Sequence, residues 1–350
     1  MVSVVILADD LTGALDSAVC FANRGMVTVV AGTIDAFAKA LRSGSDVVAV
    51  STASREISAK DAWQRVTEAL NCMCFNPPVL MKKVDSRLKG NIKVELDAFS
   101  QKKLKPHMFV CPAIPSQSRR VEGGQIVGKG VTEPIDIAKF VSRDLPLDSI
   151  VDVQNLSDIT LALPSNLKDY LFVGAAGLAE ALAIRLRPEM PPDRQSELPS
   201  PALFAIGSKD PITKAQLDKI RSVCEIVEAP NGENLHVQPN GRWRDAKVTI
   251  VEMVPGNETV SGLEASRAFS SGIVQRIQAT APATLLACGG ETAAAILNEA
   301  GMGLLTVKGE LLPGIPFAET VFNSRKMTVV TKSGGFGAED AFERVLSSIR

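Results

Sequence analysis

The chain has 350 residues, enough for about two domains, and its 45% hydrophobic and 22% charged residues exclude a disordered chain, a fibre and a coiled-coil rod. Its 38 lysines and arginines nearly balance 39 aspartates and glutamates, giving a net charge of -1. We therefore expect no nucleic-acid partner and no polybasic contact with a membrane.

The N-terminal residues lack the basic region and the cleavage site of a signal peptide, and no apolar run is long enough to cross a membrane. The six cysteines are spread along the chain without a C-x-x-C pair. These features predict a cytoplasmic location and no disulfide framework.

Short runs of β-branched residues recur in the first half of the chain and predict strands at 2–7, 27–31, 46–51, 79–84, 108–111 and 171–173. Helical patterns follow several of them. Apolar residues at helical spacing from Leu11 to Ala22 predict an amphipathic helix that ends before Gly25. Strands that alternate with helices predict a parallel sheet with helices on both faces.

Residues 188–201, PEMPPDRQSELPSP, are too rich in proline and charge for a helix or a central strand, and predict a linker. We place one domain at 1–190 and a second at 200–350. In the second, strands are predicted at 202–206, 248–253, 284–288 and 327–331, and helices from Pro211 and at 338–349. The predicted fold class is α/β, with two α/β domains, largely parallel sheets and an interdomain cleft that would hold ligands.

Two adjacent carboxylates, Asp9 and Asp10, lie between the first predicted strand and the first predicted helix. In open α/β sheets ligands bind beyond the carboxyl ends of the strands. One carboxylate is expected to cap the helix, which leaves the other free to face a ligand hydroxyl or a metal ion. The alternative is that both are only caps or turn residues.

Charged residues also follow the strand predicted at 79–84. Strand alternation places Lys83 and Asp85 on one face, where cations could hold a carboxylate and Asp85 could accept a hydroxyl proton; the alternative is a solvated cluster of neutralising charges. Arg119 lies among prolines and glycines that suit an anion-binding loop, or an ordinary exposed hairpin. The nearby GGQIVGKG at 123–130 lacks the Ser or Thr of a phosphate-binding P-loop.

Glycine-rich corners follow three predicted strands of the second half, at 207–209, 289–292 and 332–337. Glycine lets the backbone approach a ligand closely, and free amides at a helix N-terminus favour phosphate. None of the corners matches the G-x-G-x-x-G fingerprint of dinucleotide-binding folds. The alternative is that they are only tight turns between a strand and a helix.

Seven motifs resemble the four-carbon acid sugar kinase family, formerly a domain of unknown function, in order and over nearly the whole chain. They are LADDLTGALD (7–16), KKVDSRLKGN (82–91), CPAIPSQSRRVEGGQ (111–125), VGAAGLAEAL (173–182), GSKDPIT (207–213), GGET (289–292) and KSGGFGAED (332–340). The resemblance implies a sugar-acid-binding domain followed by a nucleotide-binding domain. It also implies ATP- and Mg2+-dependent phosphorylation of the terminal hydroxyl of a small sugar acid, such as 3-oxo-tetronate, D-threonate or D-erythronate.

The resemblance assigns roles to individual residues of this chain. It implies ATP contacts at Ser208, Gly289, Gly290, Glu291, Thr292, Gly334 and Gly335. The candidate catalytic residues are Asp10, preferred as the proton acceptor because it lies at a helix start, and Asp85. The candidate substrate-binding residues are Asp9, Arg87, Lys89 and Arg119. No metal ligand is implied, and the choice between a monomer and a homodimer stays open.

The chain departs from the family's usual residues at Arg87, Lys89, Ser118 and Arg120. These departures fit a changed substrate with an extra anionic or carbonyl group, or a degraded activity. Two other functions stay open: a non-catalytic protein that binds a sugar acid or a nucleotide, and an NAD-dependent sugar-acid oxidoreductase. Release of ADP in the presence of a sugar acid would separate all three.

Overall fold

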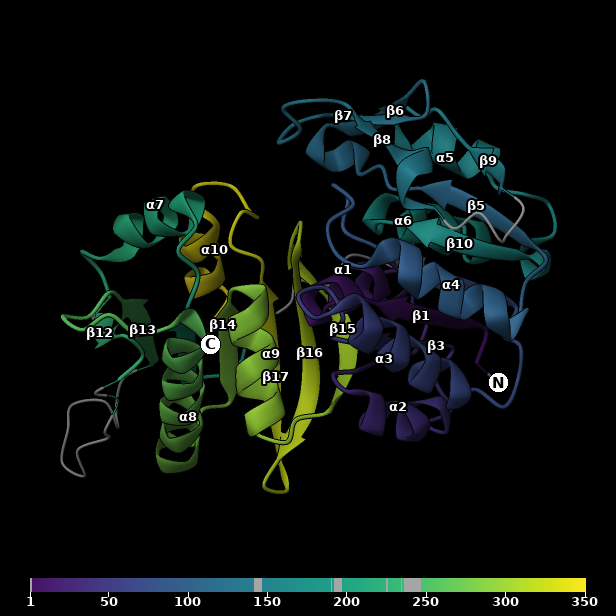
Figure 1. Ribbon diagram of the computed structural model, residues 1–350. Coiled ribbons are helices and arrows are strands. Elements are labelled where there is room, and N and C mark those ends of the chain that lie inside the picture. Colours follow the sequence, from purple (N-terminus) through teal and green to yellow (C-terminus); the bar gives the residue numbers. More distant parts are fainter. Residues whose placement is uncertain are drawn as a thin grey trace. The chain divides into compact units, whose positions relative to one another are not determined.

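The computed structural model describes residues 2–141, 147–189, 191, 197–224, 226–233, 235 and 247–350 (Figure 1). The chain divides into two compact units, Met1–Pro192 and Asp193–Arg350. The division falls in the proline-rich stretch at 188–201, of which residues 190 and 192–196 lie outside the described residues. Among the described residues, none of the helices is both long and apolar enough to pass through a membrane.

The main sheet of the N-terminal unit is parallel, in the order β2-β3-β1-β4-β10-β5-β9. Its strands are β1 (Val4–Ala8), β2 (Thr28–Ala31), β3 (Val47–Ser51), β4 (Val79–Lys83), β5 (His107–Cys111), β9 (Leu147–Ile150) and β10 (Tyr170–Gly174). The strands β1, β2 and β3 are buried along their whole length, which is why β-branched runs mark them in the sequence; β4 is equally buried but ends in Lys82 and Lys83. The predicted parallel sheet is confirmed.

The helices of this unit are α1 (Leu11–Ala22), α2 (Ile34–Leu41), α3 (Ala59–Asn71), α4 (Ile92–Lys102), α5 (Leu156–Ala162) and α6 (Ala176–Leu186). Helix α1 packs against α6, which packs against α5, while α3 packs against α4 and α2. Because crossovers between parallel strands are right-handed, the two groups cover opposite faces of the sheet. Short 3-10 turns lie at Pro115–Gln117, Ile137–Phe140 and Leu167–Asp169.

A separate small antiparallel sheet contains β6 (Arg119–Glu122), β7 (Gln125–Gly128) and β8 (Ile135–Asp136). Gly123 and Gly124 form the turn between β6 and β7 with φ angles of 57° and 72°, which suit glycine. GGQIVGKG therefore belongs to a hairpin, not to the strand, loop and helix of a P-loop. The backbone around Arg119 is likewise a hairpin, the alternative left open by the sequence.

The sheet of the N-terminal unit changes direction between β1 and β4. The chain leaves β1 through α1 toward β2, and it leaves β4 through α4 toward β5 on the other side of the sheet. Parallel sheets bind ligands beyond the carboxyl ends of two such strands. Asp9 and Asp10 follow β1 and Asp85 follows β4, so the topology places the predicted residues at this switch point.

The sheet of the C-terminal unit has the order β12-β13-β11-β14-β17-β16-β15. Its strands are β11 (Ala202–Ile206), β12 (Ile226–Pro230), β13 (Val248–Val254), β14 (Thr284–Cys288), β15 (Leu304–Leu312), β16 (Ile315–Phe322) and β17 (Arg325–Lys332). Neighbouring strands in the part of the sheet with the order β12-β13-β11-β14-β17 are parallel to each other. Strand β16 pairs antiparallel with both β15 and β17. The expectation of a largely parallel sheet is confirmed, with an antiparallel hairpin that was not predicted.

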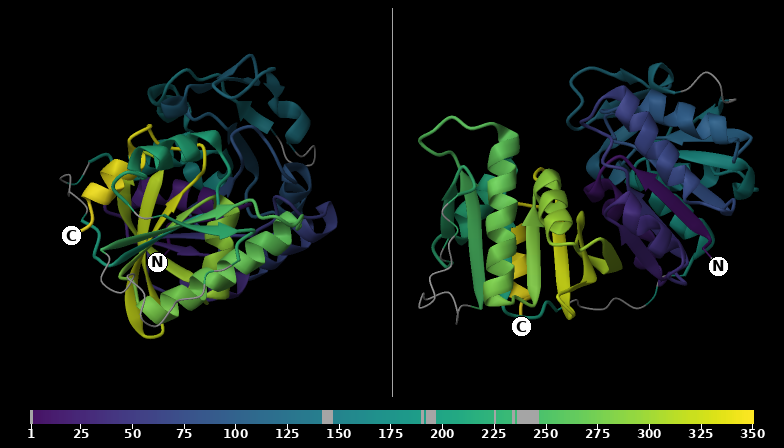
Figure 2. Two further views of the ribbon diagram at one scale, coloured as in Figure 1. Left: turned by 90° about the vertical axis from the view of Figure 1, so that its left-hand side faces the viewer. Right: turned by 60° about the horizontal axis from the view of Figure 1, so that its bottom comes forward.

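Helices α7 (Pro211–Ile220) and α10 (Ala341–Ser347) pack together, as do α8 (Gly262–Thr280) and α9 (Gly290–Glu299) (Figures 1 and 2). Alternate strand residues such as Phe204 and Ile206 form one core with α7 and α10. Helix α7 begins as predicted, because Asp210 accepts a hydrogen bond from the N–H of Ile212 at 2.9 Å and Pro211 is the first helical residue.

Helix α10 is shorter than the helix predicted at 338–349. The Gln216 amide donates to the carbonyls of Phe336, Gly337 and Ala338, and holds these residues in a loop. Gly337 has a φ of 88°, outside the range of a right-handed helix. The helix therefore begins only after Asp340.

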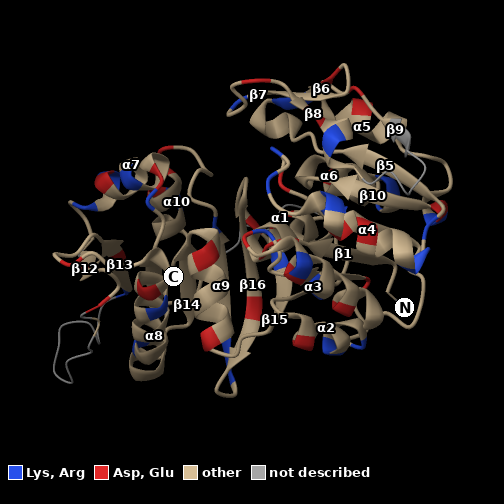
Figure 3. Cartoon of the chain, in the orientation of Figure 1, with Lys and Arg blue, Asp and Glu red and all other residues tan. Residues whose placement is uncertain are grey.

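The C-terminal sheet also has a switch point, between β11 and β14. The chain leaves β11 through α7 toward β12, and it leaves β14 through α9 toward the other edge. The glycine corners after β11 and β14 lie at this point, and the corner after β17 is next to them. Basic and acidic residues are interspersed along the elements of both units (Figure 3), as the net charge of -1 suggests.

Candidate active site

Asp9 and Asp10 bind the same guanidinium, that of Arg55. Nε and Nη2 of Arg55 donate to Asp9 at 2.9 and 2.8 Å, and Nη1 donates to Asp10 at 2.5 Å. Burial by itself would raise the pKa of Asp9, but the positive charges of Lys82 and Arg55, with the Arg55 hydrogen bonds, hold that pKa below its ordinary value. Asp10 caps α1, as expected of one of the two carboxylates, but the expectation that the other is free is wrong, because both oxygens of Asp9 accept from Arg55.

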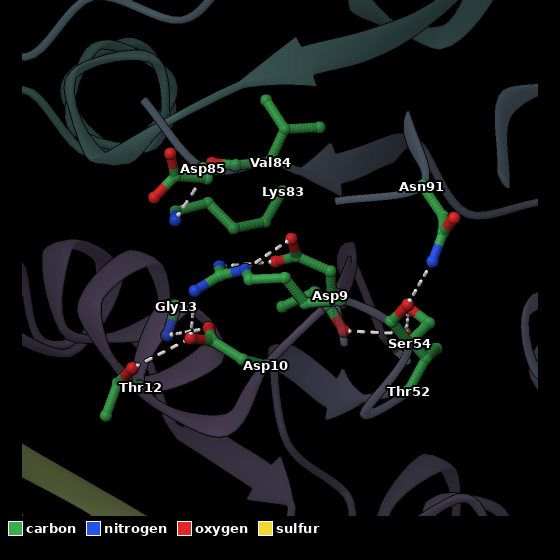
Figure 4. A network of polar contacts seen from close by, with 12 residues as sticks. Asp9, Asp10, Thr12, Gly13, Thr52, Ser54, Lys83, Val84, Asp85 and Asn91 are labelled. Carbon is green, nitrogen blue, oxygen red and sulfur yellow. Dashed lines mark hydrogen bonds and ion pairs between the residues drawn. The ribbon is translucent and has the colours of Figure 1, made fainter. Parts of the chain in front are cut away.

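Asp10 is the N-cap of α1 (Figure 4). Its carboxylate accepts hydrogen bonds from the Gly13 N–H at 2.7 Å and from the Thr12 hydroxyl at 3.1 Å, besides that from Arg55. A Cβ atom on Gly13 would lie 2.6 Å from Asp10 Oδ1 and 3.1 Å from Lys83 Nζ, so glycine is needed there. Asp10 is thus a fixed hydrogen-bond acceptor with little capacity left for a substrate proton.

Lys83 and Asp85 lie at the end of β4, close to the start of α1 (Figure 4). Lys83 is 4% exposed, and its ammonium donates to the Val84 carbonyl at 3.1 Å. Asp85 is half-buried and accepts a hydrogen bond from the Arg87 N–H at 2.9 Å. Its second oxygen has no donor among the described residues. The predicted pair is therefore brought together, with Asp85 the less engaged of the two predicted catalytic carboxylates.

Arg119 approaches the same place from β6. One Nη group donates to the Ser86 hydroxyl, and Nε donates to the Lys129 carbonyl at 3.0 Å. Burial and the nearby positive charge of Arg87 lower the pKa of Arg119, while the carboxylates of Asp85 and Asp16 act in the opposite direction. Arg119 is thus a partly desolvated cation that forms no direct ion pair among the described residues, which suits it to bind an anionic ligand.

The side chains of Arg87 and Lys89 are exposed. The charge of Arg87 acts on Arg119, which places Arg87 at the rim of the cluster. No hydrogen bond or ion pair joins the Lys89 side chain to the rest of the cluster among the described residues. The structure therefore groups Arg87 with the predicted substrate-binding residues more closely than Lys89.

Asp16 belongs to this cluster and was missed in the sequence. Burial raises the pKa of Asp16, Lys83 and Arg119 lower it, and Asp10 raises it further, so that the net change is upward. One feature of the sequence could have indicated Asp16, which is the only charged residue in the stretch Leu11–Ala22. A carboxylate in an otherwise apolar buried helix needs a polar neighbourhood, which the cluster supplies.

The three glycine corners of the C-terminal unit converge. The Gly207 N–H donates to the Cys288 carbonyl at 3.0 Å, and the Gly289 N–H donates to the Lys332 carbonyl at 2.9 Å. A Cβ atom on Gly207 would lie 2.1 Å from Thr292 Oγ1, and one on Gly334 would lie 2.3 Å from Ser208 Oγ. Each corner is thus packed against the next so closely that only hydrogen fits at these positions.

Helix α9 presents free backbone amides at this convergence. Gly289 is its N-cap with a φ of 108°, and no side chain caps the helix. Among the described residues, nothing accepts from the amides of Gly290, Glu291 and Thr292. Such amides and the helix dipole attract phosphate. The corners therefore form a candidate phosphate site that brings together the predicted residues Ser208, Gly289, Gly290, Glu291, Thr292, Gly334 and Gly335.

Comparison with known proteins separates the same two regions. Residues 4–140 match the model of a sugar-binding N-terminal domain, and residues 257–342 match that of a nucleotide-binding C-terminal domain. A D-threonate kinase of Cupriavidus necator is 29% identical over 96% of this chain and 95% of its own. A 3-oxo-tetronate kinase of Haemophilus influenzae is 22% identical over 97% of this chain and 98% of its own. The chain belongs to the four-carbon acid sugar kinase family.

The family's enzymes named above are kinases, and this member is a phosphotransferase with an alcohol group as acceptor. Solved structures share its fold. A protein of Salmonella typhimurium has a TM-score of 0.81 at 18% identity over 100% of both chains. A protein of Haemophilus influenzae has a TM-score of 0.70 at 18% identity, over 98% of this chain and 99% of its own.

The kinase family explains why the two clusters lie in separate units. The charged cluster of Asp10, Asp16, Lys83, Asp85 and Arg119 lies in the unit that matches the sugar-binding domain. The glycine corners lie in the unit that matches the nucleotide-binding domain, although Ser208 precedes the matched residues. Asp16 could not be assigned from the strand-end argument, because it lies inside α1, whereas Arg55 lies in the loop after β3 and its place four residues beyond Ser51 was the signal that could have found it.

Proposed function

We propose that the chain transfers the γ-phosphoryl group of ATP, supplied as its magnesium complex, to the terminal hydroxyl of a four-carbon sugar acid. The substrates considered are 3-oxo-tetronate, D-threonate and D-erythronate. The observation that carries the proposal is that each unit gathers its polar groups at its own switch point. Charged side chains gather beyond β1 and β4, and free amides gather beyond β11 and β14.

In this proposal the substrate carboxylate is bound by Arg119 and Lys83. Both cations are partly or wholly withdrawn from water and have no full ion pair among the described residues, so an incoming carboxylate supplies the missing charge. Arg87 adds positive charge at the rim. Asp9 has no direct role, because its two oxygens hold Arg55 in place.

Asp85 is the proposed proton acceptor. Its Oδ1 accepts from the Arg87 N–H, which fixes the carboxylate, and its Oδ2 is available to a substrate hydroxyl. Asp10 is less suited because Gly13, Thr12 and Arg55 already donate to it. Phosphoryl transfer depends mainly on positioning and on stabilisation of charge, so a carboxylate that orients the hydroxyl is the part this unit must supply.

The nucleotide phosphates are proposed to bind the amides of Gly290, Glu291 and Thr292 and the corner at Gly334 and Gly335. Asp210 faces this corner, since its Oδ2 would lie 3.3 Å from a Cβ atom on Gly335. Magnesium keeps several waters and takes one or two carboxylates besides phosphate oxygens, so a single aspartate suits the metal of a bound nucleotide. The magnesium ion would neutralise charge on the transferred group.

A coupled assay of ADP release with MgATP and each of the three acids tests the proposal. At least one acid should give turnover, and Asp85→Asn should lower kcat by about 100-fold or more with little change in the KM for ATP. Asp35→Asn, on the exposed surface of α2, is the matched control and should retain the wild-type rate. Absence of ADP release with every acid would contradict the kinase, and normal turnover by Asp85→Asn would contradict the assignment of the acceptor.

A further inference from the structure

Lys332, the last residue of β17, has a side chain that is completely buried beneath the glycine corners. Its ammonium donates to the carbonyls of Gly334 and Ser333 at 3.0 and 3.2 Å, and lies 3.5 Å from the Thr213 hydroxyl. The ring of Phe342 covers it, with the centroid 5.5 Å away. An ammonium has three donors, so these contacts account for its whole hydrogen-bonding capacity.

The charge of Lys332 lacks a counter-ion in the part of the chain that the structure describes. No carboxylate there lies within ion-pair distance of its Nζ, and its other close neighbour is the Cys288 sulfur at 4.0 Å. Asp210 acts on it only from a greater distance. A buried cation that is hydrogen-bonded but not neutralised is unfavourable, so a fold that keeps one there is expected to use it on an anion.

The hydrogen bonds to Lys332 also determine where the amides of the corner point. In a trans peptide the carbonyl oxygen of one residue and the N–H of the next lie on opposite sides. Because the carbonyls of Ser333 and Gly334 point toward the ammonium, the N–H groups of Gly334 and Gly335 point away from it. Neither N–H has an acceptor among the described residues, and Gly335 is exposed.

Thr213 connects Lys332 to the first corner. Its hydroxyl donates to the Gly334 carbonyl at 2.8 Å and contacts the Ser208 hydroxyl at 3.3 Å. The ammonium is therefore linked to the first and third corners, while the second corner is joined to the same residue through the Lys332 carbonyl, which accepts from the Gly289 N–H at 2.9 Å. Removal of that ammonium would leave the Gly334 carbonyl with the Thr213 hydroxyl as its donor and the Ser333 carbonyl with the Phe336 N–H at 3.1 Å, a weaker hold on the corner.

We propose that Lys332 is a positioning residue for the phosphates of the bound nucleotide. It turns the amides of Gly334 and Gly335 toward the phosphates from beneath, and the phosphates neutralise its buried charge. This inference rests on the proposed function, since it assumes that ATP binds at the corners of the C-terminal unit.

The first test is binding of MgADP and of a sugar acid to the full chain by calorimetry. Lys332→Met should weaken the binding of MgADP by about tenfold or more and leave the affinity for the sugar acid unchanged. Lys332→Gln, which keeps two hydrogen-bond donors without the charge, should lose less MgADP affinity than Lys332→Met. Lys326→Met removes an exposed lysine from the opposite end of the same strand and should bind like the wild type. Equal affinity of Lys332→Met and Lys326→Met for MgADP would overturn the inference.

A second test uses the unaltered protein and so does not depend on the folding of a variant. Burial lowers the pKa of Lys332, although Cys288 and Asp210 act in the opposite direction, so its charge is lost as the pH rises. MgADP affinity should fall between neutral pH and about pH 10, near the ordinary lysine pKa, more steeply than sugar-acid affinity. The Cys288 thiol is the titratable group in contact with Lys332. If MgADP affinity falls with pH in Cys288→Ala as it does in the wild type, that thiol is not the cause of the decrease.

The outcomes separate the two proposals. If the wild type binds no MgADP, the proposed function fails and the role of Lys332 fails with it. If the wild type binds MgADP with an affinity that does not fall with pH, and Lys332→Met binds it equally well, only the role of Lys332 fails.

Discussion

Arg55 lies 46 residues after Asp9 in the sequence, yet its guanidinium binds both oxygens of the Asp9 carboxylate and also one oxygen of Asp10. The planar fork of arginine matches a carboxylate in a way that the point charge of lysine does not. One cation is thus shared between two adjacent carboxylates at the end of a buried strand. The charged cluster is thus organised by a residue that would not contact substrate in our proposal.

Arg55→Lys is therefore expected to damage the N-terminal unit even though it keeps the charge. Loss of the fork should lower the free energy of unfolding by ~1–3 kcal/mol and weaken sugar-acid binding. In a Trp243→Phe background, Trp63 of α3 is the remaining tryptophan and reports on this unit by fluorescence during urea unfolding. Arg65→Lys is the control, because Arg65 donates to the Ala53 carbonyl at 2.8 Å. Equal losses for the two variants would show that the fork is unimportant.

Asp9 is expected to make the stability of this unit sensitive to acid. Its pKa in the folded chain is below its ordinary value of 3.8, so an unfolded chain takes up a proton at a higher pH than the folded one. The stabilisation is complete above the unfolded pKa and is lost as the pH falls through the folded pKa. Within that window the wild type should lose up to about 1.4 kcal/mol per pH unit more than Asp9→Asn.

Urea unfolding followed by Trp63 fluorescence, repeated from neutral pH to about pH 3, measures this difference. Asp35→Asn removes an exposed carboxylate of the same unit and should follow the wild-type slope. Parallel slopes for the wild type and Asp9→Asn would rule out a lowered pKa at Asp9.

The fold could be predicted from the sequence where an uninterrupted apolar run marks each strand. The strands at Ala202–Ile206 and Thr284–Cys288 were predicted with their observed bounds, because buried β-branched and apolar runs mark them. The antiparallel β15–β16 hairpin was missed although Pro313-Gly314 is a turn dipeptide. Its alternating pattern is interrupted where the register shifts between Val307 and Gly309, so the period of two is not maintained.

For the candidate site, the sequence could predict residues that follow individual strands, but not the partners that those residues contact. The rule that ligands bind beyond the carboxyl ends of strands identified Asp9, Asp10 and Asp85 and the glycine corners. It could not pair Asp9 with Arg55, or Lys332 with Thr213, because partners 46 and 119 residues apart leave no local pattern. For the same reason the sequence favoured Asp10 as the proton acceptor, before its three donors were visible.

The ion pair between Lys82 and Glu95 should show strong coupling. Their side chains are completely buried with Nζ and Oε2 2.8 Å apart, and the Ser54 hydroxyl donates to Glu95. Lys82→Met leaves an unpaired buried carboxylate and should cost ~3–5 kcal/mol, whereas adding Glu95→Leu should recover much of that loss. Unfolding of both single variants and the double variant, followed by Trp63 fluorescence, gives the coupling energy. Additive losses would mean that the two charges do not compensate each other.

Gly207 offers a test of how closely the first two glycine corners must approach. A Cβ atom there would lie 2.1, 2.9 and 3.0 Å from the Oγ1, Cγ2 and Cβ atoms of Thr292, so no rotation of the threonine side chain removes the clash. Gly207→Ala should lower the stability of the C-terminal unit by ~1–3 kcal/mol and weaken MgADP binding, because the start of α9 must move.

Gly262 provides the matched control for this substitution. It is the first residue of α8, and a Cβ atom there would have nothing within 4 Å, so Gly262→Ala should leave nucleotide affinity unchanged. Calorimetry with MgADP and thermal unfolding followed by circular dichroism distinguish the two variants. If Gly207→Ala is destabilised but binds MgADP like Gly262→Ala, the start of α9 does not contact the phosphates, and the proposed phosphate site must be moved away from Gly290, Glu291 and Thr292.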